Sequence, residues 1–163
     1  MIETERLLLR RPAEADVESP PAWLADPEVM DWLGGLEPPA EVVQRWVDDW
    51  ERFPTAKFLV EQKSDGALIG RVGANYYDPR TWVRSPAGDP ELGWALAREH
   101  WGHGYATEAA LAVREWLRVP RLISLIAEAN VRSQRVAERL GATPGETIEL
   151  SGYGPHVVWE HPR

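Results

Sequence analysis

The sequence predicts a mixed α/β domain, and three observations carry that prediction. Two apolar runs, 57–61 and 67–76, flank a turn at 64–66 whose Ser, Asp and Gly are typical of a tight hairpin. The run 122–127 is apolar on both faces, as in a strand at the centre of a sheet. Helical spacing over 104–118 places a helix directly before that strand, so helices and strands alternate late in the chain.

The first third of the chain is predicted to be one strand followed by helices. The stretch "RLLLR", 6–10, is a short apolar run between charges and predicts a strand. Residues 13–34 mix helix formers with breakers, which favours broken helices. Over 39–50, after prolines that suit a helix start, the apolar residues recur at helical spacing and predict an amphipathic helix: Val42, Val43, Trp46, Val47 and Trp50.

The rest of the chain completes the order strand, helices, three strands, helix, strand, helix, two strands. Residues 78–90 contain Pro and Gly and predict a loop. Gly141 is expected to end a helix in the left-handed conformation. The remaining elements expected are a strand at 91–97, a helix at 131–140, and a closing hairpin of strands near 147–150 and 156–160.

Length and charge limit the function classes. The 163 residues suit a single domain, 1–163, with a core that needs neither disulfide nor metal. The absence of Cys removes thiol nucleophiles and thiolate ligands. A net charge of −8 disfavours nucleic acid and mildly favours amine partners. The N-terminal "MIETERLLLRR" has acidic residues and only three consecutive Leu, too few for the apolar region of a signal peptide or for a membrane span. We therefore expect a cytoplasmic protein without a membrane partner.

Two glycines, Gly102 and Gly104, precede the helix at 104–118. Free backbone N–H groups and the helix dipole attract anions there, and glycine permits close approach of a phosphate. The alternative is an ordinary loop that needs positive φ. Thr107 stands where the dinucleotide fingerprint requires a third Gly, and no Gly-Lys-Ser/Thr P-loop occurs. His100 and His103 lack accompanying ligands, so we expect no metal.

The strand at 91–97 has one bulky face and one nearly bare face. Alternation points the large side chains one way and leaves the other face with Glu91, Gly93, Ala95 and Ala97. The bare face could leave room for a ligand beside a potential base, Glu91. The alternative is a face crowded by a helix, with Glu91 at an exposed strand end.

These residues carry a resemblance to a known family. The runs 91–108, "ELGWALAREHWGHGYATE", and 130–142, "NVRSQRVAERLGA", resemble the acetyl-CoA-binding core of the GNAT superfamily of N-acetyltransferases. The opening 3–12, "ETERLLLRRP", resembles the branch of RimJ and RimL type. The resemblance implies a GNAT (acyl-CoA N-acyltransferase) α/β fold: a mixed, mostly antiparallel sheet of about six to seven strands flanked by about four helices. It also implies acetyl-CoA as co-substrate.

The resemblance assigns roles residue by residue. Backbone N–H groups of the loop would bind the pyrophosphate of coenzyme A, at Gly102, His103, Gly104, Tyr105, Ala106 and Thr107. The strand backbone at Trp94, Ala95 and Leu96 would bind the pantetheine arm, and Asn130 would contact that arm. Ser133 would lie near the thioester sulfur. Glu99 stands where the family has Gln or Arg, which leaves that side-chain contact open.

Asn130 and Ser133 also have a purely local interpretation. Asn is a favoured N-cap residue, and Ser133 falls in the first turn of the expected helix. Both side chains could therefore satisfy free N–H groups of that helix.

The chemistry that the resemblance implies is direct attack of an amine on the thioester. Glu91 is the candidate general base, and backbone N–H groups near Leu96 could polarise the carbonyl. Many members use a Tyr as general acid, but 131–142 contains none, so Ser133 ranks first, before Tyr105 or water.

The acceptor is predicted only as a class, a small-molecule amine or a peptide N-terminus. The N-terminal Trp residues, Trp23, Trp32, Trp46 and Trp50, lie where the family shapes its acceptor pocket, although buried core is the alternative. A catalytically inactive coenzyme A-binding module is the rival function. A kinase-like domain would need a lysine and a metal-binding acid near the glycines, and residues 100–109 supply neither a lysine nor a hydroxyl in the right place. A strand edge or the loop 78–90 could support a homodimer.

Overall fold

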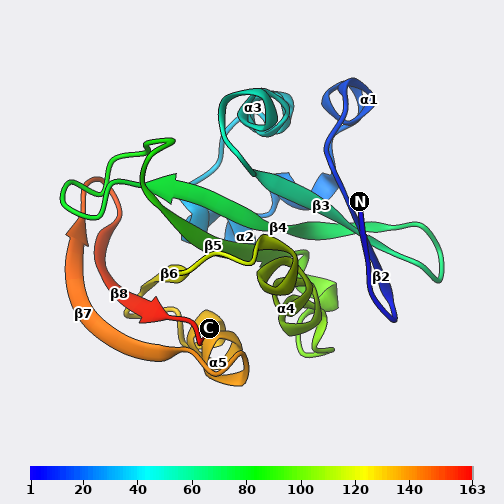
Figure 1. Cartoon of the computed structure of the whole chain (residues 1–163). Coiled ribbons are helices and arrows are strands. Elements are labelled where there is room, and N and C mark those ends of the chain that lie inside the picture. The colour runs from blue at the N-terminus through cyan, green and yellow to red at the C-terminus, as the bar shows by residue number, and fades with distance from the viewer. Residues whose placement is uncertain (163) are drawn as a thin grey trace.

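The computed structural model describes residues 1–162, whose strands form one eight-stranded sheet in the order β1-β2-β3-β4-β5-β6-β8-β7 (Figure 1). All neighbouring strands are antiparallel except β5 and β6. The strands are β1 Ile2–Glu3, β2 Leu7–Arg10, β3 Lys57–Gln62, β4 Leu68–Tyr77, β5 Asp89–Leu96, β6 Ile123–Ala127, β7 Thr143–Leu150 and β8 Gly154–Glu160. The expected mixed, mostly antiparallel α/β class is confirmed, and the strand beyond the expected number is the two-residue β1.

The helices are α1 Glu14–Glu18, α2 Pro27–Met30, α3 Pro39–Arg52, α4 Tyr105–Leu117 and α5 Val131–Arg139, with short 3₁₀ turns at Ala22–Ala25, Asp31–Leu33 and Arg98–His100. The region expected as broken helices is divided among α1, α2 and two of these turns. Pro39 starts α3 because its fixed φ suits the first helical position. Gly141, which follows the C-cap residue Leu140 of α5, has φ +75°, as expected of its helix stop.

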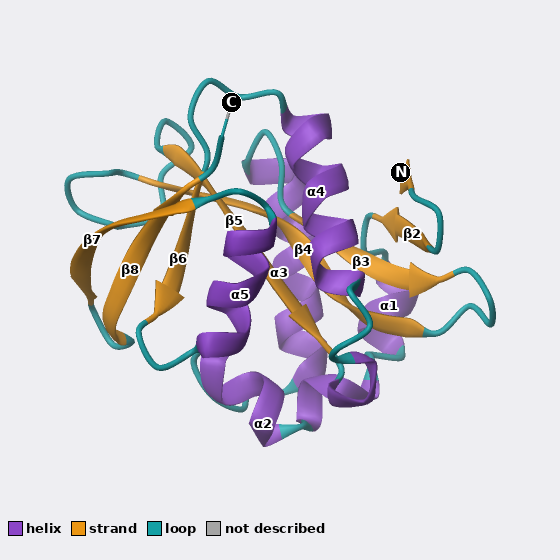
Figure 2. Ribbon diagram, turned by 90° about the horizontal axis from the view of Figure 1, so that it is seen from below, coloured by secondary structure: helices purple, strands orange, loops and turns teal. Residues whose placement is uncertain are grey.

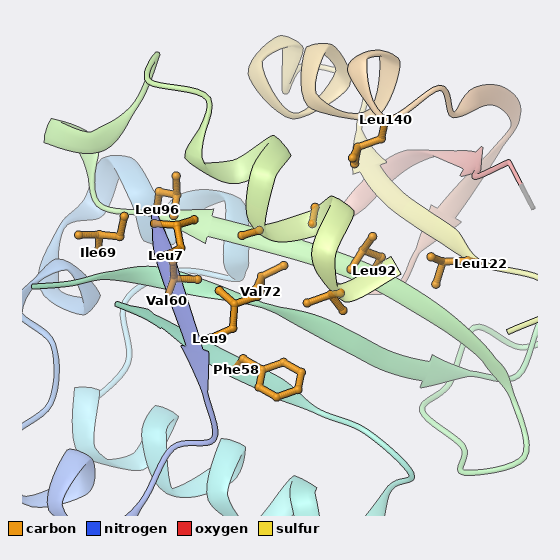
Figure 3. Close-up of a cluster of buried hydrophobic side chains, with 13 residues drawn as sticks. Leu7, Leu9, Phe58, Val60, Ile69, Val72, Leu92, Leu96, Leu122 and Leu140 are labelled. Carbon is orange, nitrogen blue, oxygen red and sulfur yellow. The ribbon is translucent and has the colours of Figure 1, made fainter. Parts of the chain in front are cut away.

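The helices cover both faces of the sheet. Figure 1 shows α1 and α3 on one side and α4 and α5 on the other, and Figure 2 shows α4 and α5 next to each other. The main core lies between the sheet and α4, with its side chains shown in Figure 3, and contains Leu7, Leu9, Phe58, Val60, Val72, Leu92 and Leu96. A second apolar cluster joins the N-terminal helices through Trp23, Leu24, Val29, Met30, Val42, Val43 and Ala97.

The sheet opens between β5 and β6. These two strands pair only at Glu91 and Ile123, whereas β5 stays paired with β4 as far as Leu96. Immediately past the single pair, side chains replace the backbone ladder, since the hydroxyl of Ser124 donates to the carbonyl of Leu92 at 2.6 Å. The two halves of the sheet therefore diverge from Glu91 onward and leave one backbone edge of β5 without a strand partner.

None of the helices described over residues 1–162 has the length and apolar character needed to cross a membrane.

Candidate functional site

A cavity of about 460 Å³ lies at the opening between β5 and β6. The start of α4, one side of α5 and the N-terminal turn around Trp32 complete its walls. The structure brings nearly all the predicted site residues to this one cavity: Glu91, Trp94, Ala95, Leu96, Gly102, Gly104, Tyr105, Ala106, Thr107, Asn130 and Ser133. His103 is the exception; it lines a neighbouring hollow together with Gly102, Gly104 and Thr107.

The glycine loop has the backbone conformation that its sequence predicts. Gly102 and Gly104 have φ of +79° and +81°, values that other residues rarely adopt, and α4 begins at the next residue, Tyr105. The N–H groups of the first turn therefore lie at the cavity without intrahelical acceptors. The hydroxyl of Thr107 is buried there without a partner among the described residues.

A contact from the turn between β1 and β2 holds this loop, and sequence reasoning missed it. Arg6 donates to the carbonyl of His103 at 3.0 Å and forms an ion pair with Glu108 at 2.6 Å. Glu108 also accepts from the hydroxyl of Thr4 at 2.6 Å. Burial raises the pKa of Glu108, but the hydrogen bonds from Thr4 and Arg6 outweigh it and lower that pKa. An acidic residue in the first turn of α4 was the available signal.

Asn130 takes the local capping role. Its side-chain oxygen accepts from the backbone N–H of Ser133 at 3.1 Å and caps α5. This bond uses neither the amide NH₂ of Asn130 nor the hydroxyl of Ser133. Both groups are therefore available at the cavity that the two residues line.

Glu91 is buried, with 8% of its surface exposed, so the alternative of an exposed strand end is wrong. One carboxylate oxygen lies 3.9 Å from the ammonium nitrogen of Lys57. The other accepts a long bond, 3.5 Å, from the backbone N–H of Leu125 across the opening. Glu91 thus stands at the point where the sheet divides and faces a buried cation.

The bare face of β5 carries charges that come from its neighbours. A Cβ on Gly93 would lie 3.1 Å from the Lys57 nitrogen, 3.2 Å from a Glu91 oxygen and 3.4 Å from Nη1 of Arg71. Strand register explains this, since Lys57 pairs with Gly73, Gly73 pairs with Gly93, and Arg71 pairs with Ala95. Sequence reasoning missed Lys57 and Arg71. The available signal was that each is a charged residue beside apolar residues within a predicted strand.

Burial shifts the pKa of these groups. It lowers the pKa of Lys57 to about 7, with repulsion from Arg71 in the same direction and attraction to Glu91 opposing it. Burial lowers the pKa of Arg71 as well. At Tyr77, which also lines the cavity, burial and the nearby charge of Glu91 raise the pKa to about 12, so its hydroxyl keeps its proton.

The predicted Trp residues divide between cavity and core. Trp32 lines the cavity together with Tyr153 from the β7–β8 turn. Trp23 is buried and stacks on Trp46 at 6.2 Å, and Trp50 packs edge-on against Phe58. Of the four, only Trp32 lines the cavity, and the core interpretation applies to the others.

The charge of the cavity is opposite to that of the chain. Glu91 is the one acidic residue among the described residues that line it, against one lysine and four arginines: Lys57, Arg71, Arg132, Arg135 and Arg139. The whole chain has a net charge of −8. Over residues 1–162 no three His, Cys, Asp or Glu side chains gather as a metal-ion site.

Comparisons with known proteins agree with this arrangement. A family model described as an acetyltransferase (GNAT) domain matches residues 6–143. The uncharacterized protein YkkB of Bacillus subtilis is 30% identical over 133 residues, which cover 76% of this chain and 73% of that protein. A solved acetyltransferase from Agrobacterium tumefaciens is 30% identical with a TM-score of 0.78, covering 99% of this chain and 94% of the other. The aminoglycoside acetyltransferase AAC(6')-Ib, solved with coenzyme A, shares the fold at 21% identity, a TM-score of 0.79 and coverage of 96% and 95%.

Proposed function

The chain belongs to the GNAT family of acetyltransferases, and on that premise we propose that Glu91 acts as general base for direct transfer of an acetyl group from acetyl-CoA to an amine. The protein is an acetyl-CoA-dependent N-acetyltransferase. Direct transfer suits a chain without Cys, which has no thiol to carry an acyl intermediate.

The observation that carries the proposal is the division of the sheet at Glu91. It leaves the β6-facing backbone edge of β5, at Trp94 and Leu96, without a strand partner inside the cavity. An extended amide chain such as pantetheine can pair with such an edge as a strand would. The carbonyl of Leu96 is already occupied, because the indole N–H of Trp101 donates to it at 2.9 Å. We therefore assign the arm to the N–H and carbonyl of Trp94 and to the N–H of Leu96. The backbone groups of Ala95 point to β4 instead, like the N–H of Ala97, which donates to Ile69.

The phosphates of coenzyme A fit the glycine loop and α5. Backbone N–H groups from Gly102 to Thr107 would receive the pyrophosphate at the positive end of α4. His103 contributes backbone only, since its ring stacks on Tyr105 and lines the neighbouring hollow. Arg139 lines both the cavity and that hollow, so it can balance phosphate charge at the same end.

The transfer needs two proton movements. Glu91, directly or through water, removes a proton from the acceptor ammonium, and the free amine attacks the thioester carbon. As the C–S bond breaks, the thiolate takes a proton from the hydroxyl of Ser133, the residue that we place nearest the sulfur, and the second proton lost by the acceptor nitrogen restores that hydroxyl, directly or through water; Tyr105 or water is the alternative donor. Backbone N–H groups near Leu96 would stabilise the oxyanion. The amide product leaves with free coenzyme A.

The rival function is an inactive coenzyme A-binding module. In that case Glu91 would have only a structural role. Its carboxylate accepts from the N–H of Leu125 and lies near the ammonium group of Lys57, at the point where β5 and β6 separate. The same cavity would bind acetyl-CoA, but no acceptor would be consumed.

The test is acetyl-CoA turnover, measured as released thiol, with a panel of amines, amino acids and peptides bearing free N-termini. Wild type is expected to consume one acceptor class, and Glu91→Gln to lower kcat by about 10²-fold or more while acetyl-CoA binding persists. Gln has the same shape and can still accept from Leu125, so lost activity would reflect the missing base. Unchanged turnover in this variant would remove Glu91 from the mechanism. Binding without turnover by wild type would favour the inactive module.

Two finer assignments rest on the sequence. We propose that residues 1–163 form a single acetyltransferase domain, supported by the one continuous sheet. We also propose that the chain belongs to the RimJ/RimL-like branch, supported by its opening "ETERLLLRRP", which forms part of the β1–β2 hairpin and supplies Arg6 to the glycine loop. A branch name does not define the acceptor.

A further inference from the structure

The end of the cavity nearest Glu91 carries more positive charge than base catalysis requires. A general base works best when the incoming ammonium meets a negative site, yet Glu91 has two buried cations beside it, Lys57 and Arg71. These two side chains come from β3 and β4 and both line the cavity. Their presence beside the acceptor position calls for a physical reason.

Arg71 is incompletely paired. Its Nε and Nη1 atoms are buried, and neither has a hydrogen-bond partner among the described residues. Leaving guanidinium donors unpaired in a buried position is costly, because each has lost its water without gaining an acceptor. A guanidinium fork matches the two oxygens of a carboxylate or phosphate. The unpaired donors can therefore bind an anionic oxygen group.

Lys57 adds a second donor at the same place. Only 3% of its surface is exposed, and its ammonium group donates to the carbonyl of Gly73 at 2.9 Å. Glu91 lies 3.9 Å away, beyond a direct hydrogen bond. The ammonium group has three N–H donors, so capacity remains for a further acceptor.

Glycine at position 93 leaves open the space where these charges meet. The Lys57 nitrogen, a Glu91 oxygen and Nη1 of Arg71 all lie within 3.4 Å of the place that a Cβ on Gly93 would occupy. A ligand that enters above Gly93 therefore meets one anion and two cations together. An amine and an anionic group on the same or adjacent carbons would match this arrangement.

These cations are separate from the coenzyme's phosphate position. Val72, Leu92 and Leu96 point into the core beneath α4, so strand alternation places Arg71, Glu91 and Gly93 on the opposite face of the sheet. The glycine loop, in contrast, begins α4 itself. The phosphates and the two cations therefore occupy different ends of the cavity.

We propose that Arg71 and Lys57 bind an anionic oxygen group of the acceptor, so that the enzyme acetylates a small amine carrying a carboxylate or phosphate group close to its reactive nitrogen. This inference rests on the proposed role of the Glu91 end as the acceptor site. The anionic group docks on the two cations while the amine lies at Glu91. Polycationic amines are disfavoured, because the second positive charge would meet Arg71.

The experiment compares matched acceptors. Each α-amino acid is paired with the amine formed by removing its carboxylate, and aminoalkylphosphonates form a third set that separates phosphate-like from carboxylate acceptors. Wild type is expected to show at least a tenfold higher kcat/KM for the anionic member. Arg71→Gln should bring that ratio close to one, mainly by raising KM, and leave the affinity for acetyl-CoA unchanged. Arg45→Gln, at an exposed ion pair with Glu37, is the matched control.

Binding of the products gives a second readout that does not depend on turnover. Calorimetry with N-acetylated amino acids and with the corresponding N-acetylated amines should detect tighter binding of the anionic series to wild type, but not to Arg71→Gln. Arg71→Lys, which keeps one charge without the fork, should fall between the two.

The outcomes separate the two proposals. Equal kcat/KM for both members of each pair, or an equal effect of Arg71→Gln on both, would overturn the anionic acceptor and leave the transferase intact. An absence of thiol release with every acceptor would count against the proposed catalysis, and the product-binding series would then decide the anion site by itself. No preference for the anionic products would overturn it.

Discussion

Lys57 is a single residue whose charge depends on its surroundings near neutral pH. Burial lowers its pKa to about 7, so the ammonium form dominates below that pH and the neutral amine above it. Its charged surroundings are Arg71, Glu91, Arg84 and Asp49. The hydroxyl of Tyr77 stays protonated, since burial raises its pKa to about 12.

The affinity for a carboxylate ligand should therefore fall as the pH rises. Between pH 6 and pH 8 the loss of the Lys57 charge should weaken binding of an N-acetyl amino acid by up to about tenfold, as calorimetry would measure. Lys57→Met should bind weakly at both pH values and lose the pH dependence. If this variant kept the slope of wild type, another group would be responsible.

Gly104 is the second residue whose role can be tested by a single substitution. Its φ of +81° and its place directly before α4 suit a phosphate that approaches the backbone. Gly104→Val should weaken coenzyme A binding by at least tenfold in calorimetry, because the side chain strains this conformation and blocks that approach. Gly66→Val is the matched control, since Gly66 has a similar φ of +74° in the β3–β4 hairpin. Equal affinity in both variants would argue against the phosphate cradle.

At the scale of elements, β6 and the end of the chain are joined by a buried polar contact. Nε2 of His161 lies 2.8 Å from the hydroxyl of Ser124, which donates to Leu92 on β5. Burial lowers the pKa of His161 to about 4, with repulsion from Arg114 adding to the effect. The folded protein therefore holds this imidazole neutral at neutral and mildly acidic pH.

This contact predicts a loss of stability in acid. The folded pKa lies below the ordinary value of 6.5, so the unfolded chain binds a proton that the folded chain does not, and stability falls from pH 6.5 towards 4. His161→Gln, which keeps a donor near Ser124, should reduce this acid loss by about 2 kcal/mol in urea unfolding. The exposed His103→Gln is the control and should keep the slope of wild type. An unaltered acid slope in His161→Gln would contradict the assignment.

Elements with strong local signals were predictable from the sequence. The hairpin around Gly66, the helix α3 with its apolar stripe, and β6, which is apolar on both faces apart from Ser124, all follow from patterns within one segment. The two-residue β1 could not be recognised, because its only support is pairing with β2.

The site divides in the same way. The glycine loop and the bare face of β5 are visible in the sequence, because backbone conformation and alternation are local. Lys57 and Arg71 meet Glu91 only through the register of β3, β4 and β5, which no single segment encodes. The same limit applies to Arg6, which reaches the loop from the other end of the chain.

For the whole molecule, net charge is a poor guide to the ligand. The chain carries −8, and this value favours amine partners in general. The cavity has one lysine, four arginines and a single acid among its described walls, which favours anions at both of its ends. The acidic groups lie elsewhere, so the surface and the site select different molecules.

The division between β5 and β6 also affects how tightly a ligand can bind. Beyond Glu91 the backbone ladder is replaced by the hydroxyl of Ser124 on Leu92, so the β5 edge is already open in the folded chain. A ligand need not break strand pairing to enter, because the cost of separating the strands is met during folding. Such preorganisation leaves more of the contact energy for affinity. It also sets the stability of the fold against the affinity for the ligand. A substitution that extended the backbone pairing of β5 with β6 beyond Glu91 would stabilise the fold but close the edge to which the ligand binds.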